Sequence, residues 1–167
     1  KTQKYVEEEY KQLFEGKNKV LGVICRGTDY LALKPSGHPV QPEIQNVIAY
    51  CKKYMEKDAY DAIYLATEER KTRDIFERAF PGKILENRRQ YYDDIYDKDT
   101  SISYIKDVHF ERENDNYWSG LEYLSSIILL SRCTALVGGN CGGTLGAIFF
   151  NDEKYEFTHI FDLGLYP

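Results

Sequence analysis

Residues 20–29 read VLGVICRGTD and place a charged turn directly after a short apolar run. The run is rich in branched residues and is followed by turn-forming residues, so we predict a fully buried strand over residues 19–25. In an open α/β sheet, ligands bind just beyond the carboxyl ends of the strands. Arg26 stands at that point, and its guanidinium stays charged and matches the oxygens of a phosphate. The stretch therefore predicts capture of a phosphorylated or nucleotide ligand.

Segments typical of strands alternate with segments typical of helices along the rest of the chain. We predict strands over residues 19–25, 62–66, 83–85, 134–137 and 157–161, and helices over residues 2–14, 42–57, 68–80, 117–132 and 144–150. A long loop over residues 27–42 and an irregular segment over 86–116 connect them. The alternation predicts an α/β fold with a doubly wound, mostly parallel, Rossmann-like sheet and helices on both faces.

The length of 167 residues suits a single domain over residues 1–167. The chain begins at Lys1 inside a helical pattern and without a methionine, so we expect a domain excised from a longer, two-domain chain. The net charge is −5 and no basic stripe is present, which argues against nucleic acid as a partner. The longest apolar stretches, near residues 127–130 and 145–150, are too short to span a bilayer.

The four cysteines are widely separated and form no Cys-x-x-Cys pair. This spacing argues against a zinc site and predicts reduced, mostly buried thiols. We therefore predict no metal site.

Three predicted strands end in polar or glycine-rich sequence, at residues 26–29, 67–69 and 138–144. Because these strands are parallel, all three ends are expected at one edge of the sheet. The glycine-rich turn precedes a helix, so it offers backbone N–H groups and the positive end of the helix dipole to an anion, and the Thr144 hydroxyl adds a donor. A tight packing turn is the alternative. No Gly-Lys-Ser/Thr follows, which argues against a P-loop.

Each of these residues can also have a purely structural role instead of binding a ligand. Arg26 either binds phosphate, which we favour, or pairs with Asp29 to fix the loop. Thr67 is a plausible N-cap, and acidic residues at 68–69 either stabilise the first turn of the helix or hydrogen-bond a ribose or base. The basic pair at 88–89 could add a second phosphate contact, but a solvated pair is the favoured interpretation.

Three segments together resemble the donor-binding motifs of GDP-fucose-dependent fucosyltransferases, a family that includes Nod-factor, α-1,6 and protein O-fucosyltransferases. These segments are GVICRGTD at 22–29, IYLATEE at 63–69 and LVGGNCGGT at 136–144. Their order and rough spacing agree with the family, and they extend over roughly residues 20–150, most of the chain.

The resemblance implies the carboxyl-terminal, donor-binding domain of an inverting GT-B glycosyltransferase. It implies that Arg26 contacts the β-phosphate and favours departure of GDP, without a bound metal or a cofactor other than the nucleotide sugar. The expected donor-binding residues are Arg26, Thr28, Asp29, Thr67, Glu68, Glu122, Ser126, Gly142, Gly143 and Thr144. The glycan acceptor is expected on a missing amino-terminal domain, so the isolated domain should be inactive. The expected setting is bacterial surface polysaccharide assembly in the cytoplasm, with the inner face of the membrane as the alternative location.

The chain also departs from the family pattern. Ile24 stands where many members have histidine, Gly27 where a second arginine lies, and 142–144 where two serines are usual. The base-contacting aspartate of the family falls near residues 125–126, with Glu122 a turn earlier. Three alternatives therefore stay open: another nucleotide sugar, a catalytically inactive nucleotide-binding or interaction module, or another phosphate-handling α/β enzyme such as a kinase or epimerase.

Overall fold

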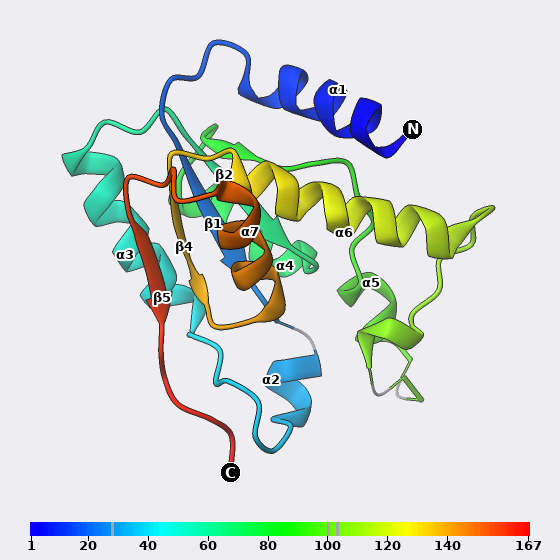
Figure 1. Cartoon of the computed structure of the whole chain (residues 1–167). Coiled ribbons are helices and arrows are strands. Elements are labelled where there is room, and N and C mark those ends of the chain that lie inside the picture. The colour runs from blue at the N-terminus through cyan, green and yellow to red at the C-terminus, as the bar shows by residue number, and fades with distance from the viewer. Residues whose placement is uncertain (28, 100, 103) are drawn as a thin grey trace.

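A parallel five-stranded sheet forms the centre of the protein in the computed structural model, which describes residues 1–27, 29–99, 101–102 and 104–167. The strand order is β3-β2-β1-β4-β5, and every neighbouring pair is parallel (Figure 1). The strands are β1 Val20–Cys25, β2 Ala62–Thr67, β3 Ile84–Leu85, β4 Ala135–Gly139 and β5 Thr158–Phe161. This arrangement confirms the predicted doubly wound, Rossmann-like fold.

Helices cover both faces of the sheet. They are α1 Thr2–Phe14, α2 Asp29–Leu33, α3 Ile44–Lys57, α4 Arg70–Ala79, α5 Asp93–Tyr96, α6 Asp115–Ser131 and α7 Gly142–Asn151, with a 3-10 turn at Ile105–Asp107. Side chains of α3 and α4 pack in one core cluster, and those of α1, α6 and α7 pack in another. Successive residues of β1 alternate between the two clusters, so the clusters lie on opposite faces of the sheet.

Strand β1 is buried along its whole length because it supplies both cores. Leu21 and Val23 belong to the cluster with α3 and α4, whereas Val20 and Ile24 belong to the cluster with α6 and α7. A central strand covered on both faces needs apolar residues at every position, which explains the unbroken apolar run in the sequence. The four cysteines are free, and all except Cys141 are buried, as predicted.

The structure corrects the predicted start of the fourth helix. Thr67 is not its N-cap but the last residue of β2, and α4 begins at Arg70. The cap comes from a distant residue: the N–H groups of Arg70 and Lys71 donate to the Asp93 carboxylate at 2.8 and 3.1 Å. Asp93 belongs to α5, so this cap depends on tertiary structure and leaves no local sequence signal.

The chain reverses its direction of winding at β1. Strands β2 and β3 lie on one side of β1, and β4 and β5 lie on the other, so the β1–β4 boundary is the topological switch point. The carboxyl ends of β1, β2 and β4 meet at one edge, as predicted. A crevice at such a point is where open α/β sheets bind ligands. Within the described part of the chain, no helix is long and apolar enough to cross a membrane.

A partly buried ring on the edge strand β5 makes stability depend on pH. His159 stacks on Tyr50 of α3, with ring centroids 3.8 Å apart, and burial lowers the pKa of His159 below its ordinary 6.5. The unfolded chain then takes up a proton at higher pH than the folded protein, so stability is lost as pH falls below about 6.5.

We therefore expect His159→Phe, which keeps an aromatic ring, to flatten the fall in melting temperature between about pH 7 and pH 5. Thermal unfolding of both proteins across this range measures the difference. An equally steep fall in the variant would show that His159 does not contribute.

Candidate functional site

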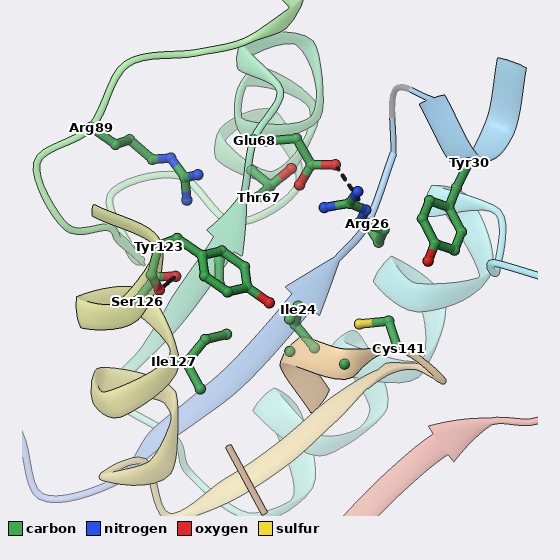
Figure 2. A pocket seen from close by; sticks show the side chains of 13 residues that line it. Ile24, Arg26, Tyr30, Thr67, Glu68, Arg89, Tyr123, Ser126, Ile127 and Cys141 are labelled. Atoms are coloured by element: carbon green, nitrogen blue, oxygen red, sulfur yellow. Dashed lines mark hydrogen bonds and ion pairs between the residues drawn. The ribbon is translucent and has the colours of Figure 1, made fainter. Parts of the chain in front are cut away.

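A pocket of about 220 Å³ opens at the switch point. Three strand ends and helix α6 supply its wall (Figure 2). Its lining side chains and glycines are Ile24, Arg26, Tyr30, Ala66, Thr67, Glu68, Arg89, Tyr123, Ser126, Ile127, Cys141, Gly142 and Gly143. The pocket therefore brings together residues from the three strand ends that we expected at one sheet edge.

Arg26 is held in place by two carboxylates and one ring. Its Nη2 donates to Asp29 Oδ1 at 3.2 Å, and its Nε lies 3.8 Å from Glu68 Oε1. The guanidinium also lies over the Tyr30 ring, 4.8 Å from the centroid. Burial acts to lower the pKa of Arg26, but Glu68 and Asp29 outweigh it and raise the pKa above its ordinary value. Arg26 thus pairs with Asp29, the structural role weighed from the sequence, and it also lines the pocket. Phosphate binding by Arg26 stays a prediction.

Two glutamates fix the turn after β1. The Gly27 N–H donates to Glu68 Oε1 at 3.0 Å. A Cβ on Gly27 would lie only 2.3 Å from the Glu69 carboxyl carbon, so this carboxylate fills the space beside the turn. Glu69 is itself buried and accepts from the Thr72 hydroxyl at 2.6 Å. Any side chain at position 27 would therefore have to displace the Glu69 carboxylate.

The start of α7 forms the opposite wall. Gly142 and Gly143 line the pocket, and a Cβ on Gly143 would lie 2.7 Å from Ile24 Cδ1 and 3.4 Å from the Tyr123 hydroxyl. The first N–H groups of a helix have no intrahelical partner and carry partial positive charge. This end of α7 can therefore donate to an anion in the pocket.

Some expected donor-binding residues do not reach the pocket wall. The Thr144 hydroxyl is buried and donates to the Gly139 carbonyl at 2.6 Å, which fixes the turn. Asp29 contacts Arg26 but is not among the lining residues. Thr28 lies outside the described residues.

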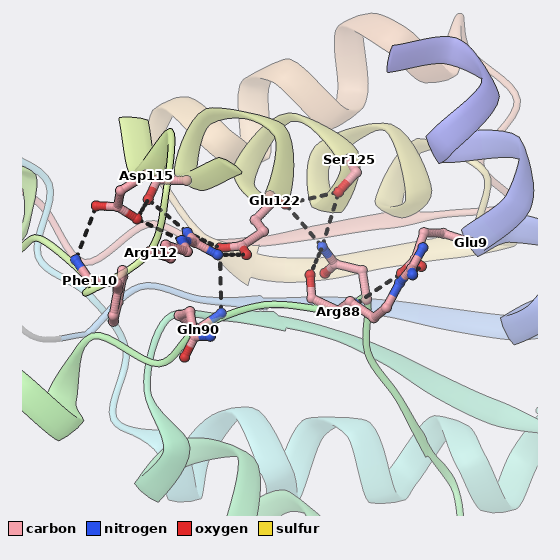
Figure 3. A network of polar contacts seen from close by, with 10 residues as sticks. Glu9, Arg88, Gln90, Phe110, Arg112, Asp115, Glu122 and Ser125 are labelled. Atoms are coloured by element: carbon pink, nitrogen blue, oxygen red, sulfur yellow. Dashed lines mark hydrogen bonds and ion pairs between the residues drawn. The ribbon is translucent and has the colours of Figure 1, made fainter. Parts of the chain in front are cut away.

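Glu122 also lies away from the pocket, in a polar network at the start of α6 (Figure 3). Its carboxylate pairs with Arg112, at 2.5 Å from Nη1 and 3.2 Å from Nη2, and accepts from the Gln90 N–H at 3.4 Å. The hydrogen bond to Glu122 is the main cause that raises the pKa of Arg112. In this structure Glu122 fixes the irregular segment to α6. Ser126, one turn further along α6, does line the pocket.

Seven lining residues were not among the expected donor-binding residues: Ile24, Tyr30, Ala66, Arg89, Tyr123, Ile127 and Cys141. Tyr123 precedes Ser126 by three residues, so helical periodicity places both on one face of α6. Burial raises the pKa of the Tyr123 phenol and keeps it a neutral donor. Arg89 follows β3 at the same sheet edge. The sequence offered the pair at 88–89 as a second phosphate contact but favoured a solvated pair; in the structure Arg89 lines the pocket.

Among the described residues, no three or more His, Cys, Asp or Glu side chains lie close enough together to hold a metal ion. Metal independence stays a prediction from the resemblance.

Comparison with known proteins gives structural neighbours but no sequence match. No protein-family model and no curated protein sequence matches this chain. The fucosyltransferase NodZ from Bradyrhizobium superposes with a TM-score of 0.54 at 15% identity, over 97% of this chain and 44% of that one. The chain shares the fold of a fucosyltransferase.

Two structures of POFUT1 agree with this result. The apo form and the complex with GDP-fucose each give a TM-score of 0.56, at 13% and 11% identity, over 95% of this chain and 46% of that one. This confirms, at the level of the fold, the resemblance inferred from three motifs. The chain spans slightly less than half the length of these neighbours.

Proposed function

We propose that this chain is the donor-binding domain of an inverting glycosyltransferase that transfers a sugar from a GDP-sugar to a glycan acceptor. One observation carries the proposal: Arg26 and the start of α7 border the same pocket at the switch point of the sheet. The fold shared with POFUT1, one of whose structures holds GDP-fucose, supports GDP as the nucleotide and fucose as the sugar.

The proposed chemistry is electrostatic assistance to a leaving group. As the bond between the sugar and the β-phosphate breaks, its electron pair stays on the phosphate oxygen of GDP. Arg26 and the backbone N–H groups of Gly142 and Gly143 would neutralise that growing charge. The acceptor hydroxyl would attack the opposite face of the anomeric carbon, which inverts it, and would give its proton to a general base.

The acceptor site and the general base belong, in this proposal, to a second domain of the full-length protein. The supporting fact is that the chain corresponds to only 44–46% of the length of NodZ and POFUT1. The domain by itself would bind the donor and transfer nothing.

A catalytically inactive nucleotide-binding module is the alternative, and a specific observation favours it. Ile24 and Gly27 occupy positions where the fucosyltransferase motif carries histidine and a second arginine, and the Glu69 carboxylate fills the space beside Gly27. Transfer activity of the full-length protein that is lost on Arg26→Gln would exclude this alternative. Nucleotide binding without transfer by the full-length protein would support it.

Calorimetric titration with GDP, GDP-fucose and UDP tests the donor proposal. We expect GDP and GDP-fucose to bind this chain, and UDP to bind at least about tenfold more weakly, because a pocket that hydrogen-bonds a purine leaves polar groups unpaired with uracil. Absence of binding by both guanine nucleotides would contradict the proposal. Equal affinity for UDP would contradict the choice of base.

A further inference from the structure

We propose that Arg89, rather than Arg26 alone, supplies the uncompensated positive charge that holds the diphosphate of the donor. Arg89 lines the pocket, and its Nε is buried and has no hydrogen-bond partner among the described residues. Figure 2 shows its guanidinium and that of Arg26 reaching into the pocket from opposite sides of the view. This inference rests on the proposed function and adds a residue to it.

The charge balance around Arg26 is the first reason. Its guanidinium pairs with Asp29 and Glu68, so one positive charge faces two carboxylates and the group carries a formal charge of −1. Each nearby carboxylate opposes the field of the arginine, so the attraction of an anion to Arg26 is weakened. Arg89 brings the pocket as a whole to neutrality. It therefore lowers the electrostatic cost of placing a diphosphate in the pocket.

The environment of Arg89 is the second reason. The neighbouring Arg88 donates through its Nε to the buried Glu9 and through its backbone N–H to the same carboxylate at 2.9 Å (Figure 3). Within the described residues, no carboxylate forms an ion pair with Arg89. A half-buried cation without a counter-ion is unfavourable in the free protein. Its place in a pocket with a second arginine points to an anionic ligand as the counter-ion.

The separation of the two arginines along the chain is the third reason. Arg26 follows β1 and Arg89 follows β3, so the two cations come from different elements on either side of β2. The hydroxyl-bearing residues Thr67 and Ser126 also line the pocket. Two cations held independently can each bind one phosphate group of a diphosphate, with hydroxyl donors between them. A monophosphate would engage one arginine only.

Titration of Arg89→Gln, Arg89→Lys and the unmodified chain with pyrophosphate, GDP and guanosine tests this assignment. Arg78→Gln is the matched control, because Arg78 is exposed on α4 and lines none of the described pockets. We expect Arg89→Gln to weaken pyrophosphate and GDP by about 10- to 100-fold, the range of one charged hydrogen-bonded contact, and to leave guanosine unchanged. Lysine should recover part of the loss, since it keeps the charge without the planar fork.

Thermal unfolding without ligand separates a binding role from a structural one. Because Arg89 forms no ion pair among the described residues, Arg89→Gln should leave the melting temperature unchanged or raise it by about 2 °C. A melting temperature that falls while GDP affinity is unchanged would overturn the assignment. A loss of affinity for guanosine as large as that for GDP would also overturn it, because it would place Arg89 at the base.

The two proposals fail in different ways. Normal GDP binding by Arg89→Gln would leave the donor proposal intact and overturn the role of Arg89. Binding of pyrophosphate but not GDP, with the loss in Arg89→Gln, would support the role of Arg89 and contradict the donor proposal. Absence of binding of both anions to the unmodified chain would overturn both.

Discussion

Replacing Arg26 with glutamine is expected to weaken GDP binding by about 100-fold or more. The substitution removes hydrogen bonds from a charged donor, each worth about 1.5–3 kcal/mol. It also exposes the anion to two carboxylates that Arg26 now neutralises, those of Asp29 and Glu68. Both carboxylates are buried, so the free energy of unfolding should fall as well. Calorimetric titration with GDP below the melting temperature of the variant measures the effect.

Two further variants make this result interpretable. Arg73→Gln removes an arginine on α4 that is also partly exposed and ion-paired, with Glu86 at 3.0 Å, but that lies outside the described pockets. It should leave GDP affinity unchanged. Arg26→Lys keeps the charge and should lose about tenfold, because a point charge cannot replace a planar fork. If Arg26→Gln and Arg73→Gln bind GDP equally, Arg26 does not contact the donor.

Replacing Gly138 with alanine is expected to lower the free energy of unfolding by about 3 kcal/mol, at the upper end for overpacking a core. Gly138 pairs with Ile24 across β4 and β1. A Cβ at this position would lie 2.3 Å from Ile24 Cγ2 and 3.0 Å from the Ile24 carbonyl oxygen. The backbone oxygen cannot rotate away, so the strands must separate or Ile24 must shift. Because Ile24 lines the pocket, GDP affinity should fall with stability.

Gly120→Ala is the matched control for Gly138→Ala. Gly120 lies on α6 with open space around its Cβ position, and alanine there should stabilise the helix by about 0.5–1 kcal/mol. Chemical denaturation of both variants gives the difference. A double variant with Ile24→Ala should lose less than the sum of the two single changes if Ile24 is the obstacle. Equal stability of Gly138→Ala and the unmodified chain would show that β4 and β1 are not packed as described.

The sequence was sufficient for the parts of the fold that depend on local pattern. The apolar run at 20–24 identified β1, and the alternation of elements predicted the parallel sheet and hence the meeting of three strand ends. Such features depend on the burial of consecutive residues, which leaves a direct trace in the sequence. The five-residue helix α2 was missed because it lies in a proline- and glycine-rich segment that is typical of a loop.

The details of the site depend on partners far apart in the chain. Asp93 caps α4 from 23 residues away in the sequence. The Arg88 side chain forms an ion pair with Glu9, which lies 79 residues earlier. For this reason the sequence could not separate Arg88, which is neutralised, from Arg89, which lines the pocket. Glu122 likewise fits the spacing of a donor contact, yet its carboxylate is occupied by Arg112. Local patterns locate the sheet edge but do not decide which charges there are already paired.

A crystal structure of this chain with GDP tests the donor-binding role of the pocket most directly. The diphosphate is predicted to lie in the pocket at the switch point, with oxygens about 3 Å from the Arg26 guanidinium and from the N–H groups that begin α7. The Arg89 guanidinium should contact the same diphosphate. GDP bound at another surface, or with its diphosphate in solvent away from Arg26 and α7, would show that this pocket is not the donor site.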